Sequence, residues 1–267
     1  MIIHADLHVH SKYSGNASDW YLQLAHSLDS YSEPEDIFVQ ALKSGQTYVT
    51  LTDHDQIEGA LRLQERYPER VFSGVEFTVY FPEDHCKVHI LVYGLNMQDY
   101  EELMRLRQDI YQFRGYLQQH QLTYSVAHAL MALDRKLSRV HLEKLVLLFD
   151  VFEGINGSQL KIQNQTWVNY LHGLTPNRID DLYHHYRIEP ISMDPWRKGF
   201  TGGSDDHAGL FIGRTYTEAK AASITEYLEA IRNKRSTAGG EHSTFRDLSS
   251  SILKVGFETA RRQPIRG

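Results

Sequence analysis

The strongest constraint on this chain is the run Asp6-Leu7-His8-Val9-His10-Ser11, which follows the apolar pair Ile2-Ile3. Residues i and i+2 of a β-strand point to the same face, so a strand here presents the imidazoles of His8 and His10 side by side. Two imidazoles held by one rigid strand suit a metal ion. The run therefore predicts a metal-binding edge beside the first strand.

Further motifs place a His or a carboxylate at the edge of a short apolar run. They are Thr52-Asp53-His54-Asp55, Gly74-Val75-Glu76, Val88-His89-Ile90, Ala127-His128 and Gly202-Gly203-Ser204-Asp205-Asp206-His207. A single His beside an apolar strand is more often a hydrogen-bonded core or surface residue than a ligand. A series of such motifs favours a multinuclear metal site instead.

Composition narrows the class of protein. With 267 residues and 41% hydrophobic content the chain can bury a large core, and we expect a single domain over residues 1–267. The net charge of −6 gives no support for broad nucleic-acid or anionic-membrane binding. One cysteine, Cys86, excludes an internal disulfide framework. Since no secretion signal and no apolar run of about 20 residues is present, we expect a cytoplasmic protein without a membrane partner.

Strand-like and helix-like segments alternate along the chain. Strands are expected at residues 2–10, 47–52, 71–79, 88–93, 149–155 and 199–203. Helices are expected from Ser32, with Glu35 as capping-box acid, to Gly45, then at 57–67, 99–119, 160–171, 178–186 and 224–234, with an amphipathic C-terminal helix at about 246–260. This order predicts a parallel sheet with helical crossovers, closed or nearly closed into a barrel.

Active residues of such barrels lie at the C-terminal ends of the strands. The rule fits His8, His10, His54, Asp205 and His207. It does not fit His89, which precedes most of its apolar run.

In order and spacing, these motifs resemble the PHP family, named for its polymerase and histidinol-phosphatase members. Residues 86–96 and 199–213 further resemble a bacterial subgroup in which this domain is sometimes joined to a glycosyltransferase. The resemblance implies an α/β fold, a distorted (β/α)7 barrel of the PHP type, holding up to three divalent metals.

The resemblance also implies a ligand set. It places His8, His10, Glu76 and Asp205 on one metal, has Glu76 bridge to a second metal on His89 and His128, and gives His54 and His207 to a third. Imidazole and carboxylate ligands together suit Zn, Mn or Fe. Asp205, Glu76 and His207 are the expected catalytic residues, with a metal-bound hydroxide attacking phosphorus and Asp205 accepting a proton. Asp6 and Asp53 are expected to orient imidazoles.

The third metal position departs from the family pattern. Family members with three metals commonly carry an acid or His about five residues after the second His of the first motif, where this chain has Gly15. Glycine cannot ligate, and Asp19 is the expected replacement. A solvated loop acid is the open alternative for Asp19, so two or three metals are expected.

Three basic residues are candidates for binding the substrate. Lys198 and Arg214 flank the Asp205 motif and could neutralise a phosphate, and Arg139 follows His128. The alternative, which is the more usual one for a basic residue on a barrel rim, is that each is simply solvated. Glu153 and Asn156 fall at another strand end and are expected to shape the pocket.

These features favour a metal-dependent phosphoesterase acting on a small phosphomonoester or a nucleotide-type phosphate. A metal-dependent exonuclease is a second possibility, which the acidic composition disfavours because a nucleic-acid backbone needs a basic track. A third is a metal-binding regulatory or structural module serving a polysaccharide-assembly or glycosyltransferase partner. The C-terminal helix would pack on the barrel or contact a protein partner.

Overall fold

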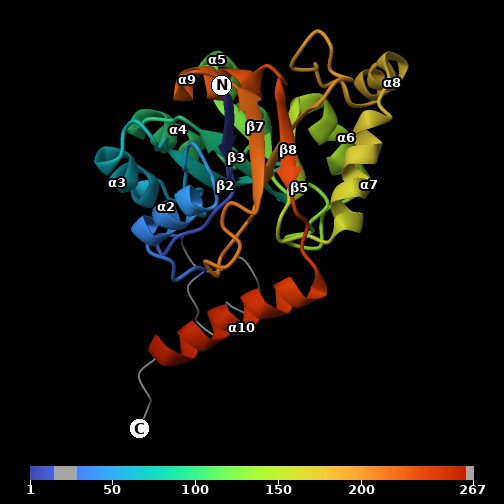
Figure 1. Ribbon diagram of the computed structural model, residues 1–267. Helices are drawn as coiled ribbons and strands as arrows, with labels where there is room; N and C mark the ends of the chain where they lie inside the picture. The colour runs from blue at the N-terminus through green and yellow to red at the C-terminus, as the bar shows by residue number, and fades with distance from the viewer. Residues whose placement is uncertain (15–28, 263–267) are drawn as a thin grey trace.

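The strands of the computed structural model form two sheets. The model describes residues 1–14 and 29–262, so the candidate ligand Asp19 lies outside the described residues. The larger sheet has the order β2 (Gly74–Tyr80), β3 (Lys87–Tyr93), β4 (Thr123–Val126), β5 (Val151–Asn156), β6 (Gly199–Gly203). The smaller sheet has the order β1 (Ile2–Ala5), β7 (Thr215–Lys220), β8 (Ser236–Gly240), shown in Figure 1.

Single bridges connect the segments between the two edges of the larger sheet. Val9, beyond β1, bridges Asp206, beyond β6, and the amide of Thr52 donates to the carbonyl of Val9. His54 in turn bridges Glu76 of β2. Among the described residues no closed sheet forms, and the architecture is a mixed α/β fold rather than a continuous barrel of strands.

The expected all-parallel order is wrong for the first half of the larger sheet. Strand β3 runs antiparallel to both β2 and β4, and only β4 with β5 and β5 with β6 pair in parallel. A turn over residues 81–86, with His85 at φ 58°, joins β2 to β3. Antiparallel neighbours can be joined by a turn, whereas parallel ones need a long crossover.

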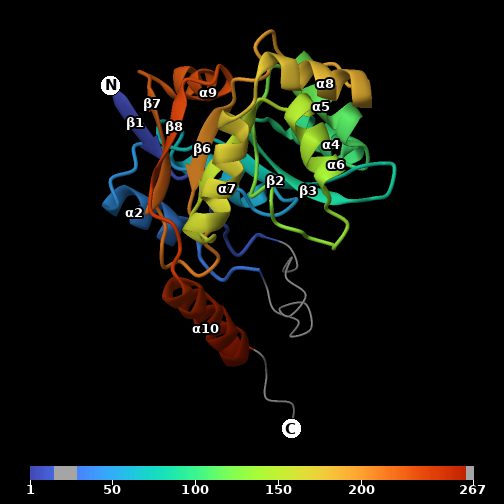
Figure 2. The same cartoon turned by 90° about the vertical axis from the view of Figure 1, so that its right-hand side faces the viewer.

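The helices flank the sheets except for the C-terminal helix, which lies beyond one end of them, as Figures 1 and 2 show. They are α2 (Pro34–Lys43), α3 (Glu58–Arg66), α4 (Met97–Leu106), α5 (Ile110–Gln119), α6 (Arg139–Leu148), α7 (Lys161–His172), α8 (Pro176–Tyr186), α9 (Ile224–Arg232) and α10 (Phe245–Arg262).

Several expected elements are corrected. The helix expected at 99–119 is broken into α4 and α5, because Asp109 caps a new helix by accepting from the amides of Tyr111 and Gln112. The strand expected at 47–52 forms only isolated bridges. Helix α2 begins after Glu33, whose side chain makes no capping bond. Strands β4, β7 and β8 and helix α6 were not expected from the sequence.

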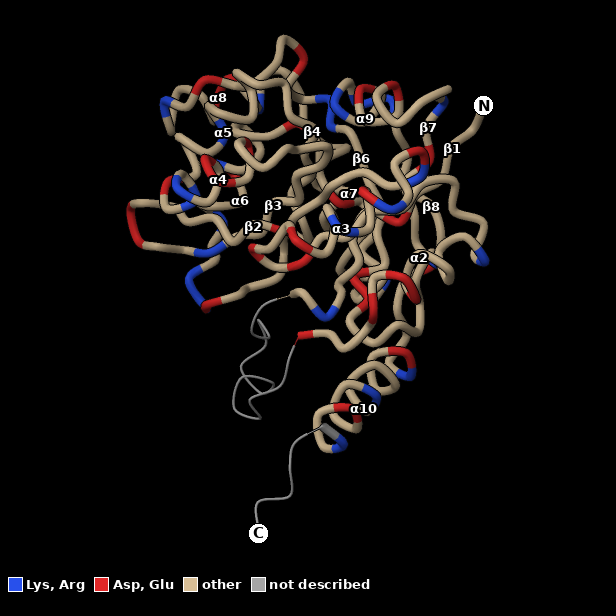
Figure 3. Tube along the Cα trace, turned by 90° about the vertical axis from the view of Figure 1, so that its left-hand side faces the viewer, with Lys and Arg blue, Asp and Glu red and all other residues tan. Residues whose placement is uncertain are grey.

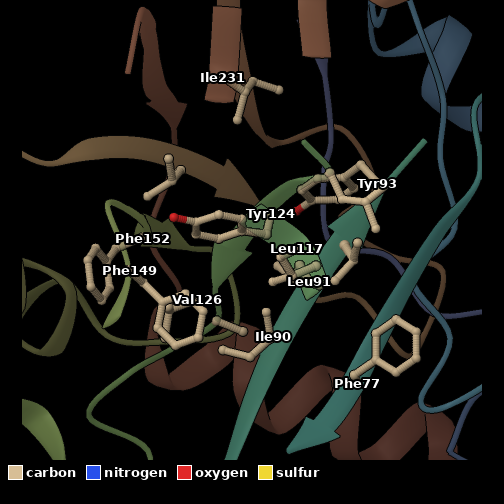
Figure 4. Close-up of a cluster of buried hydrophobic side chains, with 14 of the residues drawn as sticks. Phe77, Ile90, Leu91, Tyr93, Leu117, Tyr124, Val126, Phe149, Phe152 and Ile231 are labelled. Carbon is tan, nitrogen blue, oxygen red and sulfur yellow. The ribbon is translucent and has the colours of Figure 1, made fainter. Parts of the chain in front are cut away.

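Buried aromatic and aliphatic side chains fill the space between the larger sheet and the helices. Figure 4 shows Phe77, Tyr124 and Phe152 from the strands beside Leu117 of α5 and Ile231 of α9. Burying each such side chain contributes about 1.5–3 kcal/mol. This packing holds the strands firmly and thereby fixes the polar residues at their ends. Within the described part of the chain, no helix is both long and apolar enough to cross a membrane.

Candidate metal centre

Imidazoles and carboxylates from distant segments gather at one end of the strands. They are His8 and His10 beyond β1, His54, Glu76 in β2, His89 in β3, His128 beyond β4, and Asp205 and His207 beyond β6. Asp29, which the sequence did not single out, joins them. The expected side-by-side placement of His8 and His10 is found, with ring centroids 5.1 Å apart.

Glu76 lies at the centre of this cluster and is fully buried. Its Oε2 atom lies 3.1 Å from His8 Nε2, 3.1 Å from His54 Nδ1 and 3.3 Å from His10 Nε2. One oxygen of a single carboxylate therefore faces three imidazoles.

The other oxygen of Glu76 faces a second group. Its Oε1 atom lies 2.8 Å from His89 Nδ1 and 3.0 Å from His128 Nε2. Burial alone would raise the pKa of Glu76, but the surrounding imidazoles hold it well below its usual range. The carboxylate is therefore ionised, and each of its two oxygens faces imidazole nitrogens. A carboxylate that bridges two metals needs this arrangement.

Several atoms in the cluster are buried without a hydrogen-bond partner. They are His8 Nε2, His10 Nε2, His54 Nδ1, His89 Nδ1 and Glu76 Oε2. Buried polar atoms are almost always satisfied, so a set of orphans converging on one place indicates a missing ligand. Imidazole nitrogens and carboxylate oxygens are ligands for Zn, Mn and Fe. The residues present therefore fit divalent cations.

Among the residues that the structure describes, four sets of side chains have ligand atoms that all lie within 4.8 Å of one another. They are His8, His10 and Glu76; His8, His128 and Asp205; His54, Glu76 and His89; and His10, Asp29, His54 and His207. The grouping differs in detail from the expected one. His128 gathers with Asp205 and His8, whereas His89 gathers with His54.

Asp29 supplies a carboxylate to the set around His207. Its Oδ2 atom lies 3.0 Å from His207 Nε2, 3.6 Å from His10 Nδ1 and 3.8 Å from His54 Nε2. Ser14 Oγ donates to the same oxygen over 2.8 Å. Burial would raise the pKa of Asp29, but the imidazoles of His207 and His54 lower it below its usual range. Asp29 thus supplies this set with an ionised carboxylate, which Gly15 cannot provide.

The imidazoles around Asp29 respond to it differently. Burial opposes protonation of His207, but the attraction of Asp29 raises the pKa of His207 to about 10. Burial lowers the pKa of His54 to about 3, so this ring is neutral at physiological pH. A neutral imidazole is the form that binds a metal.

Glu153 and Asn156 hold the ligands in place. Glu153 Oε1 accepts from His8 Nδ1 over 2.8 Å, and its Oε2 accepts from the amide of His128 over 2.8 Å. Asn156 Nδ2 donates to Glu153 Oε2 and to Asp205 Oδ2, both over 3.0 Å. Because the Nδ1 atom of His8 is hydrogen-bonded to the carboxylate of Glu153, the Nε2 atom of the same ring faces the cluster.

The expected role of Asp6 and Asp53 is wrong. Asp6 accepts from the amides of Ser204 and Gly213, and Asp53 accepts from the amide and hydroxyl of Ser11. Neither carboxylate accepts a hydrogen bond from an imidazole ring of the described part of the chain. Both instead hold backbone amides of segments that lie next to the candidate ligands. Burial raises the pKa of Asp6 to about 7 and that of Asp53 to about 6.

The expected basic residues lie away from the centre. Lys198 precedes β6, at the end opposite Asp205, and its Nζ is buried against Asp150 and the carbonyls of residues 146 and 149. Arg139 is 82% exposed and paired with Glu143. Arg214 is paired with acids at 241 and 247. None of the three lines the cavity beside the cluster.

Two of the candidate ligands have an unusual backbone conformation. Asp205 has φ 51° and His128 has φ 24°, a region that residues other than glycine rarely adopt. The amide of Asp205 donates to the carbonyl of His8 over 2.6 Å, which holds the turn against the first strand segment. Such conformations concentrate at functional sites, where the surrounding structure enforces them.

A cavity of about 320 Å³ opens beside the cluster. His54, His89, His128, Asp205 and His207 line one side of it, and residues of α10 line another. In Figures 1 and 2, α10 lies across the end of the molecule opposite the N-terminus, the end toward which β1 runs.

Comparisons with known proteins support the fold and leave the family open. No family model matches the chain. An uncharacterized protein of Methanocaldococcus jannaschii, MJ1587, is 39% identical over 75 residues, covering 27% of this chain and 42% of that protein. An error-prone DNA polymerase of Cutibacterium acnes is 30% identical over 124 residues, covering 43% of this chain and 10% of the polymerase. The matches thus span less than half the length of these relatives.

Two solved structures share the fold at low sequence identity. PsfC from Pseudomonas syringae PB-5123 superimposes with a TM-score of 0.56 at 12% identity, covering 98% of this chain and 99% of PsfC. An amidohydrolase from Chromobacterium violaceum, solved with bound sulfate and no metal, gives a TM-score of 0.50 at 15% identity, covering 87% and 97%.

Proposed function

We propose that this protein is a metal-dependent phosphoesterase that hydrolyses small phosphomonoesters. The observation that carries the proposal is the position of Glu76, whose two oxygens face separate groups of imidazoles within one buried cluster. A carboxylate shared in this way can hold two cations close together, the arrangement used for in-line displacement at phosphorus. Bound there, divalent cations of the Zn, Mn or Fe type would neutralise phosphate oxygens and acidify water.

In this hydrolysis the oxygen of water bonds to phosphorus as the ester P–O bond breaks, and the proton lost by water ends on the departing alcohol. Asp205 is the residue we assign to accept the proton first. It lines the cavity, its Oδ2 is held by Asn156, and its Oδ1 lies 3.3 Å from the imidazoles of His8 and His10. Its pKa is held well below the usual range by neighbouring imidazoles, against the effect of burial. The carboxylate is therefore available as an acceptor.

Charge distribution favours a small substrate over a nucleic acid. Figure 3 shows Lys and Arg interspersed with Asp and Glu along the described chain, without a continuous basic stretch. A nuclease gains its affinity from basic residues that follow the phosphate backbone. The exonuclease alternative therefore has less support than a small phosphomonoester.

The test is metal counting combined with an activity screen. The purified protein would be loaded with Mn, Zn or Fe and assayed on a panel of phosphomonoesters, beside Glu76→Gln. Because Glu76 serves more than one set of ligands, this variant should lose more than about one equivalent of metal and most of its turnover. Glu218→Gln is the matched control, since Glu218 pairs with His4 at 2.9 Å outside the cluster.

Two outcomes would overturn the proposal. Full metal content and turnover in Glu76→Gln would show that the cluster is not the active centre. A metal-loaded parent protein that hydrolyses none of the panel would instead support a regulatory or structural metal-binding module.

A further inference from the structure

Helix α10 forms an apolar wall of the cavity. Leu248, Ser251, Ile252 and Val255 line it, at the spacing of three and four residues that places side chains on one helix face. Val255 is only 5% exposed. Phe211, Met131 and Leu133 add further apolar surface from two loops.

Both ends of α10 are attached to the region of the metal centre. Before the helix, the amide of Ser243 donates to the carbonyl of Gln159 over 3.0 Å. Near its end, the hydroxyl of Tyr31 donates to Thr259 over 3.0 Å. Tyr31 lies two residues beyond Asp29. The wall therefore has a defined position relative to the candidate ligands.

Other lining residues offer uncharged hydrogen-bonding groups. These residues are Ser158, Gln159, Gln163 and Ser243. The hydroxyl of Ser158 donates to the backbone carbonyl of Asp205 over 3.2 Å, which connects these residues to the segment that carries Asp205. A ligand in the cavity therefore meets the apolar side chains of α10 together with uncharged hydroxyls and amides.

Outside the candidate metal ligands, the described lining residues of the cavity include no cationic side chain that could receive a second anionic group. Among its described lining residues there is no Lys or Arg, and residues 15–28 contain none in the sequence. The one lining acid outside the candidate ligands, Asp206, already accepts from the amides of residues 208–211. Lys12, on the first loop, is paired with Glu33 over 2.6 Å.

We propose that the site selects phosphomonoesters whose alcohol part is uncharged and has one apolar face. The proposal rests on the phosphoesterase function above and names its substrate class. The phosphate of such a substrate meets the metal centre, while the alcohol contacts the apolar side chains of α10 and the uncharged polar residues of the cavity. An additional anionic group would lose its hydration in this cavity without gaining a partner, and burying an unpaired charge is costly.

The test compares substrates that differ in one anionic group. Phenyl phosphate and 4-carboxyphenyl phosphate share a ring and a leaving oxygen, and adenosine 5′-monophosphate and adenosine 3′,5′-bisphosphate share a nucleoside. For the metal-loaded parent, kcat/KM should favour the member without the additional charge by roughly 10-fold or more in each pair.

A pair of variants then locates the discrimination. Ile252→Lys places an ammonium in the cavity wall and should raise kcat/KM for 4-carboxyphenyl phosphate relative to phenyl phosphate by about fivefold or more. Leu253→Lys adds the same charge to the same helix on a side chain that is 72% exposed and does not line the cavity. It should leave the ratio unchanged.

The possible results separate the two proposals. If the parent hydrolyses phosphomonoesters but prefers the members with the additional anionic group, or if both lysine variants change the ratio equally, the substrate class is wrong and the phosphoesterase function stands. If no phosphomonoester is hydrolysed, both proposals fall together.

Discussion

Asp29 and Glu76 have different parts in the candidate metal centre. Glu76 touches imidazoles of several ligand sets through two oxygens, whereas Asp29 uses one oxygen within a single set that includes His207. Removing each carboxylate should therefore have a different effect on the number of bound metals.

We predict that Asp29→Asn loses about one equivalent of metal, because an amide oxygen is a weaker ligand than a carboxylate. Metal held by the sets around Glu76 and Asp205 should remain, and turnover should fall by about tenfold or more. Elemental analysis of the metal-loaded protein measures the first effect. Asp19→Asn should bind as many metal equivalents as the parent. Metal loss in Asp19→Asn but not in Asp29→Asn would instead indicate that Asp19 is the ligand of the third metal.

The sequence indicated the histidines, Glu76 and Asp205 because each adjoins an apolar run that reads as a strand. Asp29 has no such neighbour. Its place beside His10 depends on the path of the chain between the first strand segment and α2, and periodicity carries no information on that path. Its position could be found only in three dimensions.

The direction of β3 explains why His89 broke the rule of C-terminal strand ends. Since β3 is antiparallel to β2, with His89 opposite Thr78, the beginning of β3 lies beside the end of β2. Alternation of side chains is the same in either direction along a strand. The sequence therefore predicted the strand and placed the candidate ligand His89 on it. It could not predict the direction of the strand, nor that β1 joins β7 and β8 in a separate sheet.

Close packing between β6 and the segment after β1 leads to a prediction at Gly203. A Cβ atom there would overlap the Cβ of His8 and lie 2.5 Å from its backbone nitrogen. Gly203→Ala should therefore displace His8, reduce bound metal and lower the free energy of unfolding by about 2 kcal/mol or more. Chemical denaturation measures the last quantity.

Gly115 in α5 is the matched control, because a Cβ there meets nothing within 4 Å. Gly115→Ala should raise the free energy of unfolding by about 0.5–1 kcal/mol, since alanine favours a helix. Parent-like stability and metal content in Gly203→Ala would contradict the described contact of the two strand segments.

The stability of the whole chain should depend on alkaline pH through Lys198. Its side chain is 1% exposed, and burial lowers its pKa to about 8 despite the attraction of Asp150. An unfolded lysine titrates near about 10.4, so between these values the unfolded chain binds more protons than the folded one. The contribution of Lys198 to the free energy of unfolding therefore rises as the pH increases from about 8 to about 10.4.

Lys198→Met removes this contribution, so the stability of the parent minus that of the variant should increase by about 1 kcal/mol or more from pH 8 to pH 10. Denaturation curves at several pH values measure the difference. The exposed Lys43, at the end of α2, provides the control variant Lys43→Met. A difference curve for Lys198→Met as flat as that of the control would contradict the prediction.

Cations that bind the cluster should stabilise the entire fold, because the candidate ligands come from segments between His8 and His207 that unfolding separates. At a free metal concentration of about 100 times the dissociation constant, binding raises the free energy of unfolding by about 2.7 kcal/mol. Chelation should thus lower the melting temperature of the parent by about 5 °C or more. Differential scanning calorimetry checks this, and Glu76→Gln should respond much less. Equal melting temperatures with and without chelator would count against metal binding.

The pairing of β1 with β7 joins Ile2 to Lys220, close to opposite ends of the chain. A ribosome that adds about 5–20 residues per second needs roughly 10–40 s to make the intervening segment. During that time β1 has no partner strand, and the histidines beyond it have no closed site. The full cluster can be completed only after Asp205 and His207 have been made, so a metal that needs these ligands would bind late in synthesis and not as the first motif emerges.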